Sequence, residues 1–136
     1  EETKQFSQIA NDFNLDLILL VAPTTPLERM KMISSRTRGF SYLVSVTGVT
    51  GERNNLENRV ENLIGQLKEI SSNPVAVGFG ISTPDHIIKV RHWGADGVII
   101  GSAFVKRISD SKDSQIVNEV GKFCSEMRSA ADEILD

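Results

Sequence analysis

The sequence has a single cysteine, Cys124, among its 136 residues. One cysteine cannot form an internal disulfide, so the chain suits a reducing compartment, and bacterial cytoplasm and plastid stroma fit equally well. Aromatic residues make up only 6% of the chain. No apolar run approaches the ~20 residues that a membrane-spanning helix needs, so we expect no membrane partner.

No basic run occurs, and 15 Lys and Arg residues against 18 Asp and Glu residues leave a net charge of -3. This balance argues against a nucleic-acid partner. The two histidines, His86 and His92, have no cysteine or carboxylate cluster around them, so we expect no metal site. A hydrophobic fraction of 40% is too high for a disordered chain, and we interpret residues 1–136 as a single domain.

Near-continuous apolar runs rich in β-branched residues predict strands at residues 15–21, 40–46, 75–79 and 97–100. Runs without polar alternation are typical of strands that are covered on both faces, as in parallel sheets. Helices are predicted between and after these runs. Their signals are a capping box at Thr25–Glu28, an apolar stripe over residues 56–70, a Thr83-Pro84 start, a Ser102 cap, and an amphipathic segment at residues 116–135 with Cys124 in its apolar stripe.

The alternation of strands and helices with short connections predicts right-handed βαβ units around a parallel sheet. Two architectures fit this order: an open doubly wound sheet, or part of a (β/α)8 barrel. A complete barrel needs about 200–250 residues, so four strands can supply only half of one. The chain begins with Glu1 rather than Met, and we therefore expect it to be processed, cut, or part of something longer.

Glycine-containing turns follow three of the predicted strands, at residues 46–51, 78–82 and 101–103. They fall at strand carboxyl ends, where parallel α/β proteins place their sites. Glycine lets backbone N–H groups approach an anion closely, and a helix start adds unpaired amides. Any one glycine could serve only a tight turn, but three such turns in successive units favour a shared phosphate site. The sequence has neither a Walker A pattern nor a GxGxxG motif.

Four segments together resemble the tryptophan synthase α-subunit family. They are LVAPTTPLER at residues 20–29, LVSVTGVTG at 43–51, PVAVGFGIS at 74–82 and ADGVIIGSAFVK at 95–106. They resemble the fifth to eighth strands of that family in order and at fitting spacing. The resemblance implies an α/β fold, the C-terminal half (strands 5–8) of a (β/α)8 TIM barrel.

The resemblance also implies an activity. This family is a carbon–carbon lyase of tryptophan biosynthesis that cleaves indole-3-glycerol phosphate to indole and glyceraldehyde 3-phosphate by retro-aldol cleavage. It implies no cofactor in the α subunit itself, since the pyridoxal phosphate belongs to a partner β subunit that receives the indole. Residue by residue, the implied phosphate-binding positions are Gly51, Gly80, Gly101 and Ser102.

Tyr42 matches a tyrosine near the family's active site, where its hydroxyl would assist the acid/base group. Thr50 matches a threonine that helps to hold a catalytic aspartate as the sixth loop closes. The principal acid/base carboxylates belong to the second strand and second loop of the family, which have no counterpart here. Asp12, Asp16 and Asp96 precede strands and fall at the opposite mouth. The segment is therefore expected to be inactive alone.

Two other functions remain open at this point. A free-standing indole-3-glycerol phosphate lyase would use the same barrel without a β subunit. A non-catalytic half-barrel would bind sugar phosphates and pair its open sheet edges with another copy or a partner, because bare edges are a liability.

Overall fold

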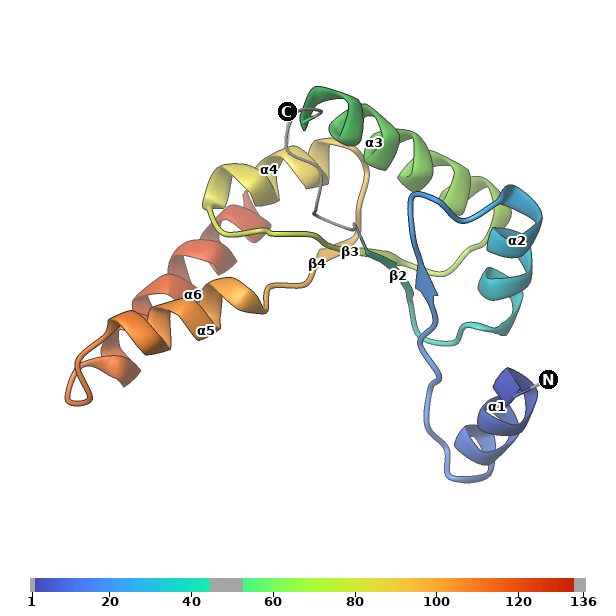
Figure 1. The fold of residues 1–136 in the computed structure, drawn as a ribbon, viewed down its shortest axis with the longest axis horizontal. Coiled ribbons are helices and arrows are strands. Elements are labelled where there is room, and N and C mark those ends of the chain that lie inside the picture. The colour runs from blue at the N-terminus through green and yellow to red at the C-terminus, as the bar shows by residue number, and fades with distance from the viewer. Residues whose placement is uncertain (1, 45–52, 134–136) are drawn as a thin grey trace.

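A computed structural model of the protein describes residues 2–44 and 53–133. Strands and helices alternate along the described chain as the sequence predicts (Figure 1). The elements in order are α1 (Glu2–Asp12), β1 (Leu20–Val21), α2 (Leu27–Arg36), β2 (Ser41–Val44), α3 (Arg53–Ile70), β3 (Val75–Gly78), α4 (Pro84–His92), β4 (Gly97–Val98), α5 (Ser102–Asp110) and α6 (Ile116–Asp132).

The four strands form one parallel sheet in the order β1-β2-β3-β4. Neighbours along the chain are therefore neighbours in the sheet, as successive βαβ units of a barrel require. The strands are shorter than predicted, most of all β1 and β4, which each pair with one strand only. Single backbone bonds continue beyond the ladders, from the Arg38 N–H to the Leu17 carbonyl at 3.1 Å and from the Ile99 N–H to the Val77 carbonyl at 2.9 Å.

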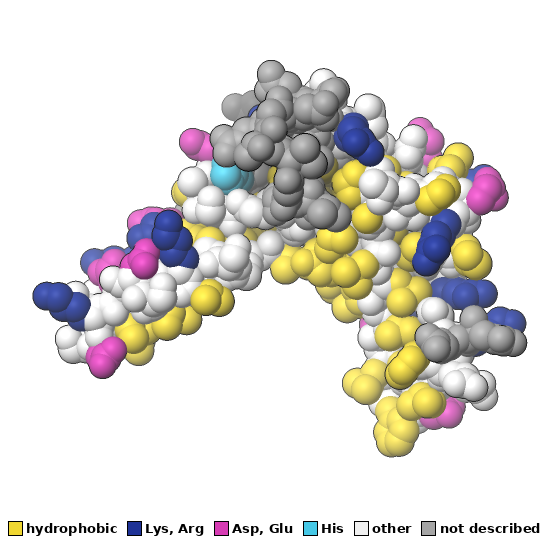
Figure 2. Space-filling view, viewed as in Figure 1, with side chains coloured by type: hydrophobic (Ala, Val, Ile, Leu, Met, Phe, Trp, Pro, Cys, Tyr) yellow, Lys and Arg dark blue, Asp and Glu magenta, His cyan; other side chains and the backbone are white. Residues whose placement is uncertain are grey.

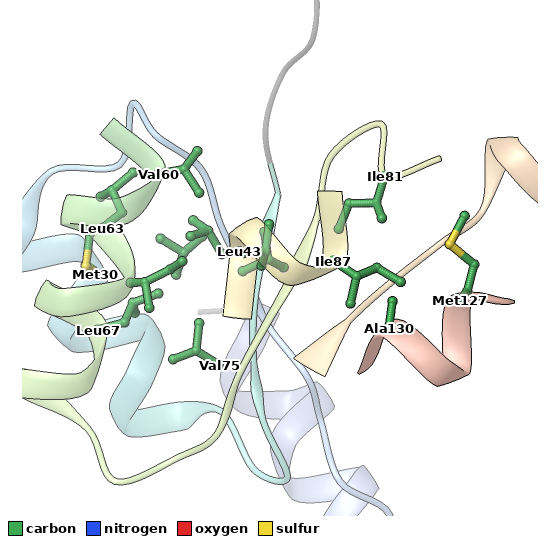
Figure 3. Packing of buried hydrophobic residues seen from close by; sticks show 14 of the residues in the cluster. Met30, Leu43, Val60, Leu63, Leu67, Val75, Ile81, Ile87, Met127 and Ala130 are labelled. Carbon is green, nitrogen blue, oxygen red and sulfur yellow. The ribbon is translucent and has the colours of Figure 1, made fainter. Parts of the chain in front are cut away.

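Helices cover one face of the sheet and bury the hydrophobic core there (Figures 1 and 3). Alternate strand residues point into this core, which explains why Leu43 and Val77 are buried while their chain neighbours are only half-buried. The apolar stripe of α3 packs from one side, and α4 and α6 pack from the other. The core side chains of these helices are Val60, Leu63, Ile64, Leu67, Ile87, Val90, Phe123, Met127 and Ala130.

The other face of the sheet is not covered by any of the described helices. In one register row, Leu20 on β1 is 54% exposed, and Tyr42 and Ala76 on the inner strands are half-buried. Figure 2 shows apolar side chains gathered along the concave side of the molecule. The expectation of strands covered on both faces is thus wrong for the described chain. The apolar runs fit a barrel instead, because the second face of a barrel strand lines the barrel interior.

Two side chains fasten the amino-terminal edge of the sheet. Asp96 accepts the Val75 N–H at 2.8 Å and pairs with Lys68 at 3.1 Å, which ties α3 and the start of β4 to the start of β3. Asn73 donates its side-chain amide to the carbonyls of Thr37 at 3.1 Å and Ser34 at 3.5 Å, at the end of α2. These bonds fix the edge opposite the glycine turns.

The helices bear on one further expectation, the position of Cys124 in the apolar stripe of the last helix. Cys124 is exposed on α6, so its interpretation as a core residue is wrong. Phe123 and Met127 take the buried positions of that stripe instead. Within the described part of the chain, no helix combines the length and hydrophobicity needed to cross a bilayer.

Candidate functional site

The candidate site lies where β2, β3 and β4 end. Tyr42 is on β2, Gly80 follows β3, and Gly101 and Ser102 follow β4. Because these strands are parallel neighbours, their carboxyl ends share one edge of the sheet. Thr50 and Gly51, the other two predicted site residues, lie outside the described residues.

Tyr42 lies across Gly78 on the open face of the sheet. A Cβ added to Gly78 would come within 2.7 Å of both the hydroxyl oxygen and Cε2 of Tyr42, closer than real contacts allow. Tyr42 is registered with Ala76, yet its ring end reaches Gly78, two residues nearer the carboxyl edge. The phenol hydroxyl is thereby directed toward the candidate site. No local pattern in the sequence indicates this role of Gly78, because the contact joins residues 36 positions apart.

The loop between β3 and α4 is anchored on both sides of Gly80. Before it, Phe79 stacks on Trp93 with ring centroids 6.4 Å apart. After it, Ile81 is only 3% exposed and joins the core beside Ile87 (Figure 3). Gly80 itself has φ of +53°, a conformation that glycine adopts without the strain a Cβ would bring. The chain thus exposes the Gly80 backbone between two fixed side chains.

The start of α5 is open to a ligand. Ser102 was expected to cap this helix, but Gly101 is the N-cap and makes no side-chain bond, so Ser102 is the first helical residue. Among the described residues, the Ser102 hydroxyl and the Ser102 and Ala103 amides have no hydrogen-bond partner. Gly101 has φ of -119°, and a Cβ there would meet no described atom within 4 Å. Packing among the described residues therefore does not demand glycine at 101.

The start of α4, by contrast, is closed by its own side chain. Thr83 is the N-cap, as its sequence with Pro84 predicts, and its hydroxyl accepts the His86 N–H at 3.4 Å. Of these two neighbouring helix starts, only that of α5 has first amides and an adjacent hydroxyl without a partner in residues 2–44 and 53–133. Such a helix start is a ready anion-binding site.

The carboxylates Asp16, Glu28 and Asp96 lie away from the carboxyl edge of the sheet or bond to structural partners. Asp96 holds the amino-terminal end of β3, and Asp16 pairs with Arg38 at 3.7 Å before β2. Glu28 pairs with Lys31 in the first turns of α2 at 2.9 Å. No group of three or more His, Cys, Asp and Glu residues in the described ranges could hold a metal ion.

A protein-family model matches nearly the whole chain. The family model described as "Tryptophan synthase alpha chain" matches residues 1–132. The chain belongs to this family. A tryptophan synthase alpha chain of Prochlorococcus marinus (strain MED4) is 71% identical over 133 residues, covering 98% of this chain and 48% of the relative. One from Synechococcus sp. (strain CC9902) is 58% identical over 132 residues, covering 97% of this chain and 49% of the relative.

Solved α-subunit structures share the fold. A mutant tryptophan synthase alpha-subunit from Pyrococcus furiosus superposes with a TM-score of 0.80 at 37% identity, covering 93% of this chain and 50% of that one. A structure of the Pyrococcus furiosus tryptophan synthase a2b2 complex gives a TM-score of 0.81 at 38% identity, covering 93% and 51%. The chain thus spans about half the length of its family relatives. The predicted fold, half of a TIM barrel made of its strands 5–8, is confirmed.

Proposed function

We propose that this chain is the phosphate-holding half of a tryptophan synthase α-type lyase. In the whole protein it would bind indole-3-glycerol phosphate, which is cleaved to indole and glyceraldehyde 3-phosphate. The observation that carries the proposal is the open α5 start. There Gly101 leaves space beside the Ser102 and Ala103 amides and the Ser102 hydroxyl, which have no partner within the described part of the chain. Family membership supports the same substrate.

Each proposed site residue has a distinct task. The amides of Gly80 and Gly101 and the amide and hydroxyl of Ser102 would hold the phosphate, whose charge the α5 dipole favours. Gly51 would complete this set from the sixth loop, and Thr50 would help to close that loop. A phosphate fixed at this edge would hold the glycerol chain in place for cleavage.

The bond cleavage itself needs groups that the described residues do not place at the site. Retro-aldol cleavage requires protonation of the indole ring at C3 and removal of a proton from the glycerol hydroxyl. Tyr42 would assist that acid/base chemistry from β2, since its hydroxyl is directed to the carboxyl edge. The principal carboxylates would come from the half of the barrel that relatives have beyond the matched region. Alone, the chain would release no indole.

The remaining parts of the proposal follow the family. The half-barrel would need no cofactor of its own, and pyridoxal phosphate would be held by a β subunit. The a2b2 complex of the Pyrococcus furiosus protein supports a β subunit as partner. Relatives from cyanobacteria support the bacterial cytoplasm as the compartment rather than a plastid stroma.

A titration with glycerol 3-phosphate tests the phosphate-holding role. The 136-residue chain would be labelled with nitrogen-15 and its amide shifts followed as the ligand is added. We expect the largest shifts at Gly80, Gly101 and Ser102. Gly101→Ala should weaken binding at least about tenfold without loss of stability, because the added methyl fills ligand space and meets no described atom. Gly121→Ala on α6, also free of contacts, is the matched control. Equal binding by the wild-type and Gly101→Ala chains would refute the assignment.

A further inference from the structure

His86 lies in the first turn of α4 and reaches back to the loop that carries Gly80. The Ser82 N–H donates to His86 Nδ1 at 3.3 Å. In the same turn, the backbone N–H of His86 donates to the Thr83 hydroxyl at 3.4 Å and to the Thr83 carbonyl at 3.2 Å. One residue therefore bonds to both Ser82 and Thr83 of the loop, through its ring and its backbone.

This contact resembles a capping box displaced by one residue. In that motif the side chain three residues after the N-cap accepts the N–H of the cap itself. Here Thr83 is the N-cap and His86 is three residues later, but the imidazole accepts the N–H of Ser82, the residue before the cap. The bond thus extends beyond the helix and constrains the loop itself.

The loop is the part of the chain that such a bond can influence. Ile81 is fixed in the core, while Ser82 is exposed, so the peptide joining them is free to turn unless Ser82 is held. That peptide lies one residue beyond Gly80, whose φ of +53° glycine reaches as easily as other conformations. Holding the Ser82 amide therefore restricts the conformations open to the Gly80 backbone.

We propose that His86 is a positioning residue for the phosphate site. Its Nδ1 fixes the Ser82 amide and so holds the Gly80 loop in the conformation that presents its backbone to the phosphate. This role rests on the proposed function. Because the His86 ring accepts a hydrogen bond at Nδ1, its neutral form carries its proton on Nε2. The contact therefore also selects one of the two neutral tautomers.

Nuclear magnetic resonance of the nitrogen-15-labelled chain tests the contact without any ligand. An N–H···N bond produces a scalar coupling between the two nitrogens, here the Ser82 amide nitrogen and His86 Nδ1. We expect this coupling, and a His86 ring protonated only at Nε2 in its neutral form. Absence of the coupling, with a ring protonated at Nδ1, would overturn the proposal.

Three variants then connect the contact to binding of glycerol 3-phosphate. His86→Ala removes the acceptor and should raise the dissociation constant about threefold to tenfold, the loss expected for one neutral hydrogen bond. His86→Asn places an amide oxygen near the former Nδ1 position and should restore affinity to within about twofold. His92→Ala is the matched control. That histidine lies at the other end of α4, with Nδ1 2.9 Å from the Ile88 carbonyl, and its loss should leave affinity unchanged.

The outcomes separate this role from the proposed function. No binding by the wild-type chain would overturn both. Binding with equal affinity by the wild-type and His86→Ala chains would overturn the positioning role alone. A weakened His86→Ala chain that His86→Asn does not restore would also overturn it, because the acceptor would then not be the cause.

Discussion

The contact between Tyr42 and Gly78 leads to the sharpest prediction of the structure. Gly78→Ala places a methyl group 2.7 Å from the Tyr42 hydroxyl oxygen and Cε2, so the ring must move. Overpacking of this kind costs about 1–3 kcal/mol. Replacing a strand glycine with alanine returns about 0.5–1 kcal/mol through reduced chain entropy. We therefore expect a net loss of roughly 1 kcal/mol in the free energy of unfolding.

The same substitution should change sign when the ring is absent. In a Tyr42→Ala background the overlap no longer exists, and only the entropy gain of about 0.5–1 kcal/mol remains. Gly78→Ala should then stabilise the chain. The double-mutant cycle over both positions should show a coupling energy of about 1–3 kcal/mol.

Urea unfolding of the four proteins measures this coupling. The fluorescence of the single tryptophan, Trp93, reports unfolding in all four, since neither substitution alters it. An equal effect of Gly78→Ala in both backgrounds would show that the two residues do not touch, and the orientation assigned to the Tyr42 hydroxyl would be refuted.

Stability measurements by urea unfolding test three other features of the fold. Asp96→Ala should lower the free energy of unfolding by about 1–3 kcal/mol, because it leaves the Val75 N–H without its acceptor. Lys68→Ala removes only a half-exposed ion-pair partner and should lower it by under about 1 kcal/mol. Equal losses in the two variants would contradict the role of Asp96 as the acceptor for Val75. Asn73→Ala should cost about 1–2 kcal/mol through its bonds to the end of α2, and an unchanged midpoint would show that those bonds do not form. Gly65→Ala in α3 should stabilise by roughly 1 kcal/mol, because its Cβ meets no described atom within 4 Å and alanine is the better helix former; a destabilised variant would mean that the position is not open.

The order of elements could be predicted from the sequence because it depends on local signals. Apolar runs located all four strands, and the Thr83-Pro84 pair located both the start of α4 and its cap. The residues that cap each helix were less well predicted than the helices themselves. The Thr25 hydroxyl accepts the Ala22 N–H at 3.0 Å instead of capping α2, whose N-cap is Pro26. A hydroxyl with two possible backbone partners cannot be assigned from spacing alone.

Contacts between distant residues were beyond the reach of the sequence. In the sequence, Gly78 is the first glycine of the turn at residues 78–82, and only the structure places Tyr42 against it. The candidate phosphate site was predicted as a set of turns. Whether a helix start at this site can accept a ligand depends on whether a nearby side chain bonds its first amides, as at α4, or does not, as at α5. Spacing in the sequence does not determine this. Ser102 illustrates this. It lies one residue after the N-cap, and its hydroxyl has no partner among the residues that the structure describes.

The central claim is that this chain provides the phosphate-holding half of the lyase and none of its principal acid/base groups. Indole release from indole-3-glycerol phosphate tests it directly in two proteins: the 136-residue chain, and a chimera in which it replaces the matching 133 residues of the 71%-identical Prochlorococcus marinus relative. We expect no release by the chain alone and turnover near that of the relative by the chimera. Release by the isolated chain at a rate close to the chimera's, or a folded chimera without activity, would contradict the claim.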